Sequence, residues 1–253
     1  FQKEDIKVES MDYGFRFVEL QLSGFDRPYE RHGNKYIVTA PGYRMKYVSH
    51  SESRNENGLQ LLFVLRDDLT DVYVDAYVQF YDELPVMRMW QVIRNEGTDT
   101  QTVEYISGFH YEGIEKEGLV PRDEKMRVWI PHNSWQRELN WKCYTLPELG
   151  MDQIQPERIQ RSSGMIRISN TGNWSAKEYL PMAYLENTCV GTGLFWQIEH
   201  NGSWHWEIGD QNGHLYLAVS GPNEIYSHWF KHLTSGESFT SVPVPQFLQA
   251  LAV

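Results

Sequence analysis

The sequence VYVDAYVQF, residues 72–80, alternates apolar side chains with polar or aromatic ones at every second position. A period of two places the two sets on opposite faces of a β-strand. β-rich runs at 59–65 and 86–93 flank this stretch, and the turn at 95–98 (Asn-Glu-Gly-Thr) leads into another run at 102–106. We therefore expect residues 59–106 to form consecutive strands of an antiparallel meander.

Short β-rich runs continue along the rest of the chain, separated by Gly, Asn, Asp and Pro. Such spacing is typical of β-sandwiches and barrels, and the one weak helical pattern, at 112–119, is interrupted by two glycines. The pattern predicts an all-β fold with little helix. The further strands that we expect are at 13–22, 36–39, 43–48, 126–130, 165–168, 179–185, 193–198, 203–208, 215–219, 226–230 and 238–242.

Length and charge limit the classes of protein to which the chain can belong. Its 253 residues fit one all-β domain, 1–253, because such domains often reach about 200–250 residues. With 23 Lys+Arg against 34 Asp+Glu the net charge is −11, and no basic run exceeds two residues, so we expect no nucleic-acid partner. No apolar stretch approaches the ~20 residues that cross a bilayer, so we expect no membrane partner.

Cysteine content and the two ends suggest where the protein works and how it is bounded. Cys143 and Cys189 are the only cysteines, which favours two reduced, partly buried thiols and a cytoplasmic location, although one bridge remains possible. The chain begins at Phe1 rather than Met, which indicates either a processed precursor or a trimmed piece of a longer protein. Residues 131–161 lack strand alternation and predict a long, partly structured excursion, in which Trp135 and Trp141 are either exposed anchors or groups that hold the loop down.

The densest aromatic signal lies at 200–208, HNGSWHWEI. Asn201-Gly202 is a strong hairpin-turn signal, and Trp204 and Trp206 share one face of the strand that follows, while His205 points the other way. Two indoles on one strand face can form a platform for a sugar ring. Packing in the core or against another domain is the alternative, since Trp is highly buried on average.

A second cluster, residues 169–175 (SNTGNWS), places Trp174 among small polar side chains in a predicted turn. It suits either a tight loop or recognition of sugar hydroxyls. No phosphate loop, dinucleotide fingerprint, serine-hydrolase elbow or zinc-helix motif is present, so we expect no cofactor. Two His pairs, 200/205 and 228/232, lie too far apart along a strand to share an ion, so we expect no metal site.

Four long strings carry a more specific signal, together with supporting segments at 40–51 and 141–151. Their order and spacing resemble the amino-terminal domain of glycoside hydrolase family 36 α-galactosidases over nearly the whole chain. The strings are SNTGNWSAKEYLPMAYLEN (169–187), GLFWQIEHNGSWHWEIGD (193–210), LYLAVSGPNE (215–224) and HWFKHLTSGESFTSVPV (228–244).

The resemblance implies a large antiparallel β-supersandwich similar to galactose mutarotase, which precedes a catalytic (β/α)8 barrel. Members of that family retain anomeric configuration, using two Asp residues on the barrel, one of them in a Lys-Trp-Asp or Lys-Tyr-Asp motif. Neither tripeptide occurs in this sequence, so no catalytic residue is carried over. We expect the barrel to follow residue 253 and to be absent from this chain.

The predicted function is therefore that of a non-catalytic domain of a bacterial α-galactosidase, inactive alone. It would support its own barrel, homo-oligomerisation and access of α-galactosides. The loop at 24–32, with Asp26 and Arg27, is a candidate for reaching a partner subunit's pocket; the other candidate binding or interdomain residues are Trp174, Trp204, His205 and Trp206. Alternatives are a free-standing carbohydrate-binding module and the same domain of an α-N-acetylgalactosaminidase.

Overall fold

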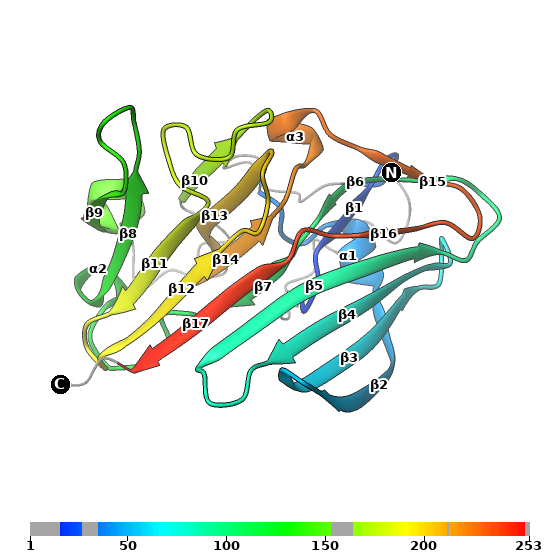
Figure 1. Ribbon diagram of the computed structural model, residues 1–253, viewed down its shortest axis with the longest axis horizontal. Helices are drawn as coiled ribbons and strands as arrows, with labels where there is room; N and C mark the ends of the chain where they lie inside the picture. Colours follow the sequence, from blue (N-terminus) through cyan, green and yellow to red (C-terminus); the bar gives the residue numbers. More distant parts are fainter. Residues whose placement is uncertain (1–15, 27–34, 153–163, 212, 251–253) are drawn as a thin grey trace.

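The computed structural model describes residues 16–26, 35–152, 164–211 and 213–250, and it describes the side chains of the last strand as far as Phe247 (Figure 1). Strands dominate these residues and the helices are short, which confirms the predicted fold class. The helices are α1 (Ala40–Arg44), α2 (Arg122–Lys125), the 3-10 helix η2 (Pro147–Leu149) and α3 (Glu224–Ser227). The strands are β1 (Leu20–Leu22), β2 (Lys46–Asn55), β3 (Gly58–Asp67), β4 (Val72–Phe80), β5 (Val86–Asn95), β6 (Gln101–Ile106), β7 (Phe109–Glu112), β8 (Met126–His132), β9 (Asn140–Thr145), β10 (Met165–Asn170), β11 (Met182–Asn187), β12 (Thr192–Gln197), β13 (Trp204–Gln211), β14 (His214–Ser220), β15 (Lys231–Leu233), β16 (Ser238–Thr240) and β17 (Val244–Ala250).

A ten-stranded antiparallel sheet forms the largest layer, and Figure 1 shows it running from β2 at lower right to β9 at upper left. Its order is β2-β3-β4-β5-β17-β12-β11-β8-β9, with β16 also paired to β5. β17 lies between β5 and β12 and joins the two halves of the sheet. The meander β2 to β5 is continuous, as predicted for β3 to β5.

Two smaller sheets pack against this layer and divide the core in two. The sheet β1-β6-β15 contributes residues such as Leu20 and Val103 to a cluster with Val74 of β4. The sheet β10-β13-β14-β7 contributes Trp206 and Leu217 to a larger cluster with β8, β11 and β12. The alternating sequence of β4 explains why this strand contributes to the core. Its apolar side chains all lie buried on the inner face of the large sheet: Val72, Val74, Ala76 and Val78.

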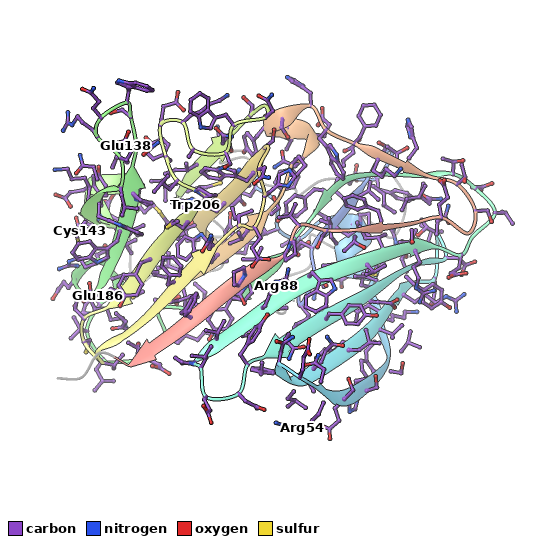
Figure 2. All side chains as sticks on the ribbon, in the orientation of Figure 1. Arg54, Arg88, Glu138, Cys143, Glu186 and Trp206 are labelled. Carbon is purple, nitrogen blue, oxygen red and sulfur yellow. The ribbon has the colours of Figure 1, made fainter. Side chains whose placement is uncertain are left out.

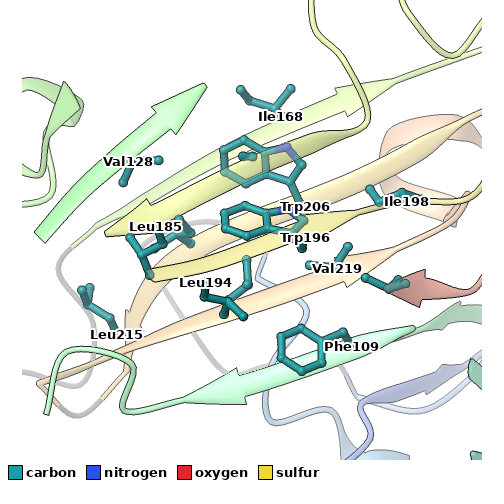
Figure 3. Packing of buried hydrophobic residues seen from close by; sticks show 14 of the residues in the cluster. Phe109, Val128, Ile168, Leu185, Leu194, Trp196, Ile198, Trp206, Leu215 and Val219 are labelled. Carbon is teal, nitrogen blue, oxygen red and sulfur yellow. The ribbon is translucent and has the colours of Figure 1, made fainter. Parts of the chain in front are cut away.

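Two tryptophans form the centre of the larger cluster (Figure 3). Trp196 of β12 and Trp206 of β13 come from facing sheets, and their rings meet edge to face with centroids 5.4 Å apart. Both side chains are fully buried. Edge-to-face pairs of this kind add about 0.5–1.5 kcal/mol to the free energy gained by burying the ring area.

Several expected strands differ in the structure. Residues 102–106 form β6, but β6 pairs with β1 and β15 rather than continuing the meander. Residues 36–39 form an irregular, buried segment that leads into α1, and 226–230 begin in α3, because Asn223 caps that helix by accepting a hydrogen bond from the Tyr226 amide. The helical pattern at 112–119 is a turn region rather than a helix.

The turn at Asn201-Gly202 and the excursion at 131–161 also need correction. β12 and β13 flank Asn201-Gly202 but belong to different sheets, so these residues form a crossover and not a hairpin. The excursion contains β9, which pairs with β8 in a regular hairpin from His132↔Asn140 to Arg127↔Thr145. Both cysteines are unbridged, as favoured, but exposed rather than partly buried.

Candidate functional site

β13 carries three of the predicted site residues and is buried along both faces. Trp204 and Trp206 are 1% and 0% exposed and point into the core between the sheets. The Trp204 indole Nε1 donates to the Ser175 carbonyl at 2.7 Å. No sugar face can lie on either indole in this structure, so the platform interpretation is wrong for Trp204 and Trp206, and the alternative, core packing, is what the structure shows.

His205 lies on the opposite face of β13, as predicted, and is also fully buried. Its Nδ1 lies 2.6 Å from Ser169 Oγ and its Nε2 lies 3.0 Å from Glu207 Oε2. Its ring stacks on Tyr226 of α3 with centroids 4.4 Å apart. Both ring nitrogens therefore have partners within the protein, and solvent does not reach them.

Glu207 lies at the centre of a buried polar cluster, which consists of Glu207, His205, Ser169, Tyr36 and Tyr216. Its Oε1 accepts hydrogen bonds from the Tyr36 amide at 2.9 Å and from the Tyr216 hydroxyl at 2.8 Å. Burial, followed by the charge of Glu207, raises the pKa of Tyr216 well above its usual value, and the same causes raise the pKa of Tyr226 to about 12. Both phenols therefore keep their protons at neutral pH, and the Tyr216 hydroxyl can donate a hydrogen bond to the Glu207 carboxyl group.

The cluster holds the segment 35–39 against the outer face of the β13–β14 sheet. Tyr36 stacks flat on Tyr105 with ring centroids 3.8 Å apart, and its hydroxyl donates to Asn223 Oδ1 at 3.2 Å. Lys35 Nζ donates to the Asp210 carbonyl at 3.0 Å and lies 3.7 Å from the Asp210 carboxylate. Residues 36–39, which were predicted to form a strand, are thus held by hydrogen bonds that involve side chains and not by the backbone hydrogen bonds of a β-sheet.

The space beside this cluster is too small for a sugar. A cavity of about 10 Å³ lies against Glu19, His110 and Tyr216, and a space of that size holds at most a single water. Burial raises the pKa of Glu19 to about 7 and lowers the pKa of His110 to about 4. These perturbed groups are enclosed in packed structure, and no glycosidic bond can come between them.

The remaining predicted site residues lie at or near the surface. Trp174 is 65% exposed in the loop between β10 and β11, and Asp26 is exposed after β1. Arg27 lies outside the described residues. The roles predicted for Trp174, Asp26 and Arg27 stay predictions.

A pocket that the sequence patterns did not predict lies on the β8–β9 hairpin, whose β9 strand contains Cys143 and whose turn contains Glu138 (Figure 2). It is open to solvent and has a volume of about 260 Å³. One signal was available in the sequence, the alternation of Asn140, Lys142 and Tyr144 along β9. The lining residues are His132, Asn133, Ser134, Arg137, Asn140, Lys142 and Tyr144.

Within the described part of the chain, no group of three or more His, Cys, Asp or Glu side chains is arranged to hold a metal ion. No described helix is both long and apolar enough to cross a membrane.

Comparison with known proteins gives matches among solved structures only: no family model and no curated protein sequence matches the chain. GH36 α-galactosidase AgaB from Geobacillus stearothermophilus superposes with a TM-score of 0.69 at 14% identity, covering 95% of this chain and 31% of that one. AgaA from the same organism, in complex with raffinose, gives 0.68 at 14% identity over 95% and 31%. The galactosidase domain of the α-galactosidase-sucrose kinase AgaSK gives 0.65 at 19% identity over 81% and 28%.

The chain has the fold of one region of these α-galactosidases. The resemblance expected from the sequence is thereby confirmed at the level of fold, which is what identities below 20% can establish. The chain spans about 28–31% of the length of these α-galactosidases. The rest of each enzyme has no counterpart among these 253 residues.

Proposed function

We propose that this chain is the amino-terminal, non-catalytic β-sandwich domain of an α-galactosidase of glycoside hydrolase family 36. The observation that carries the proposal is the asymmetry of the match: the α-galactosidase fold accounts for 95% of this chain but for only 31% of the enzyme. The closed polar cluster around Glu207 supports it, since retaining glycosidases need two carboxyl groups about 5–5.5 Å apart around an open substrate site.

The proposed role is mechanical. The domain would pack on its own (β/α)8 barrel, support homo-oligomerisation and shape the access of α-galactosides of the melibiose or raffinose type, in a bacterial cytoplasm. Exposed side chains such as Trp174 and Asp26 are the candidates for contacts of this kind. The buried network at β13 would keep the sandwich rigid.

An activity assay tests the first part of the proposal. The purified 253-residue chain should not hydrolyse 4-nitrophenyl α-galactoside above a blank preparation, and neither should a Glu207→Gln variant. Turnover at an enzyme-like rate that the Glu207→Gln variant loses would refute the proposal, because it would place chemistry within this chain.

The coding sequence beyond residue 253 tests the second part. The proposal requires a barrel with two catalytic acidic motifs downstream. With that longer protein, activity on aryl α-galactoside and on aryl α-N-acetylgalactosaminide would separate the two sugar specificities. A reading frame that stops after the sandwich would contradict the proposal.

A free-standing carbohydrate-binding module is the second candidate, and the exposed Trp174 among small polar residues favours it. Calorimetry with galactose, melibiose and raffinose distinguishes the two. A module should bind one of these sugars and lose binding in Trp174→Ala, whereas a supporting domain should show no saturable heat with any of them.

A further inference from the structure

The open pocket on the β8–β9 hairpin has no role in the proposed function. β9 is the end strand of the large sheet, and its register places Tyr144 opposite Val128 and Lys142 opposite Ile130. Val128 and Ile130 point into the core, so Tyr144, Lys142 and Asn140 share the inner face of the sheet. At this end strand that face supplies the wall of an open pocket.

The charge of the pocket is opposite to that of the chain. Arg137 and Lys142 line it together with His132, and the lining contains no carboxylate, although the net charge of the protein is −11. Neither Arg137 nor Lys142 has an ion-pair partner among the described residues. The cations on β2 differ, since Lys46 is paired with Asp68 and Arg54 with Asp82.

The acidic residue closest in sequence to these cations is held elsewhere. Glu138, in the turn of the hairpin, accepts a hydrogen bond from the Gln136 amide at 3.0 Å and does not line the pocket. An anionic ligand would therefore meet two cationic side chains without first displacing an internal carboxylate. Arg in particular binds carboxylate and phosphate through two parallel N–H bonds.

The neutral lining groups suit hydroxyls. The Ser134 hydroxyl and the side-chain amide of Asn140 have no hydrogen-bond partner among the residues described. Together they offer both donors and acceptors. Tyr144 adds a third polar group, its hydroxyl lying 2.8 Å from His132 Nε2. A ligand with only an acid group would leave Ser134 and Asn140 unused.

The backbone of the hairpin is fixed before any ligand arrives. The Asn133 amide donates to the Glu178 carbonyl at 2.8 Å, and its side-chain Nδ2 donates to the carbonyls of Ala176 and Lys177. Gln136 and Leu139 adopt left-handed backbone angles, φ 62° and 55°, which non-glycine residues rarely do. Held conformations of this kind are concentrated at ligand sites, because they set side chains in place in advance.

We propose that this pocket binds an anionic monosaccharide, with the phosphate or carboxylate on Arg137 and Lys142 and the sugar hydroxyls on Ser134 and Asn140. The volume of about 260 Å³ lies just below the range of about 300–1,000 Å³ usual for small-molecule sites, and it accommodates one sugar ring. The proposal is independent of any α-galactosidase activity of the longer protein.

The test is calorimetry on the purified chain at low ionic strength with four ligands: galactose 6-phosphate, galacturonate, galactose and inorganic phosphate. At least one of the first two should bind with one-to-one saturation, at least about tenfold more tightly than either galactose or inorganic phosphate. The identity of the tighter ligand tells a phosphate site from a carboxylate site.

Two double variants assign the binding to this pocket. R137Q/K142Q should weaken binding at least about tenfold, since it removes both charge-assisted contacts. K46Q/R54Q removes the same charge from β2 and should leave the affinity unchanged; Figure 2 places Arg54 at the bottom of the view, away from Glu138 and Cys143 on the left. Thermal unfolding of both variants should match that of the wild type, because the substituted residues are exposed.

Three results would overturn the proposal. One is the absence of saturable heat with both sugar acids, and another is equal loss of affinity in the two double variants. The third is inorganic phosphate binding as tightly as galactose 6-phosphate, or galactose as tightly as galacturonate, because the site would then recognise a simple anion or a neutral sugar. None of these outcomes bears on whether the chain belongs to an α-galactosidase.

Discussion

Replacing Glu19 by Gln tests the buried polar structure most directly. The Glu19 side chain accepts hydrogen bonds from the amides of Val38 and Thr39, and its Oε2 lies 2.9 Å from Thr39 Oγ1. Thr39 Oγ1 also lies 2.6 Å from the Leu20 carbonyl, which can only accept. A hydroxyl has one proton, so a protonated Glu19 that donates to Thr39 completes the network, and this geometry favours the neutral carboxyl.

Burial raises the pKa of Glu19 from 4.5 to about 7, although hydrogen bonds from Val38 and Thr39 and the charge of Arg16 oppose the shift. Between these two pH values the folded chain keeps a proton that the unfolded chain has lost. This contribution to stability is therefore full below pH 4.5 and is lost as the pH rises through 7. At about 1.4 kcal/mol for each pH unit the whole contribution is about 3 kcal/mol.

Urea unfolding of the wild type and of Glu19→Gln, at about pH 5 and about pH 8, measures the effect. The variant loses one hydrogen bond, because its amide nitrogen cannot accept from the Thr39 amide, and should be less stable at pH 5. This deficit should shrink by about 2 to 3 kcal/mol by pH 8, since only the wild type contains the titrating group. Glu56→Gln is the matched control, because it removes one carboxylate from the exposed β2–β3 turn. A deficit that is the same at both pH values would show that Glu19 is not the buried acid described here.

Four other substitutions test separate parts of the structure. Trp206→Ala should lower the free energy of unfolding by about 3–5 kcal/mol, because it empties the centre of the larger core cluster, whereas Trp174→Ala should change it by less than about 0.5 kcal/mol; urea titration compares the two. Gly42→Ala should cost about 1–3 kcal/mol in the same titration, because a Cβ there would lie 2.6 Å from Glu19 Oε2. His110→Gln should remove a contribution that rises with pH between about 4 and 6.5, since burial lowers the pKa of His110 to about 4 and the folded chain releases a proton that the unfolded chain keeps. Stability profiles of His110→Gln and the wild type that run parallel from pH 4 to 7 would contradict that assignment.

The parts of the fold that the sequence predicts well are those governed by local alternation. β4 is predicted to the residue at 72–80, because one of its faces is covered by the core and the other is partly solvated. The partner of a strand is a different matter. Asn201-Gly202 predicts a turn, but a local signal does not show which sheet the next strand joins. β12 belongs to the ten-stranded sheet and β13 to the four-stranded sheet.

The site was harder to predict for the same reason. β13 alternates Trp204 and Trp206 with His205 and Glu207, which suggests one aromatic and one solvated face. In the structure a distant segment at 35–39 and helix α3 cover the polar face, so every residue of the strand is buried. The hairpin pocket likewise depends on side chains of β8, β9 and the turn between them, which only the β8–β9 register brings together.

The position of β17 has a consequence for the order in which the protein can assemble. The Gln91 amide of β5 bonds to Ser241, just before β17, across 150 residues of sequence. A ribosome must therefore release the whole intervening chain before the two halves of the large sheet can close, while β2 to β5 can pair among themselves much earlier. Until then β5 presents an unpaired edge to other chains, and pulsed hydrogen exchange during refolding should show amides in β3 and β4 protected before those of β17.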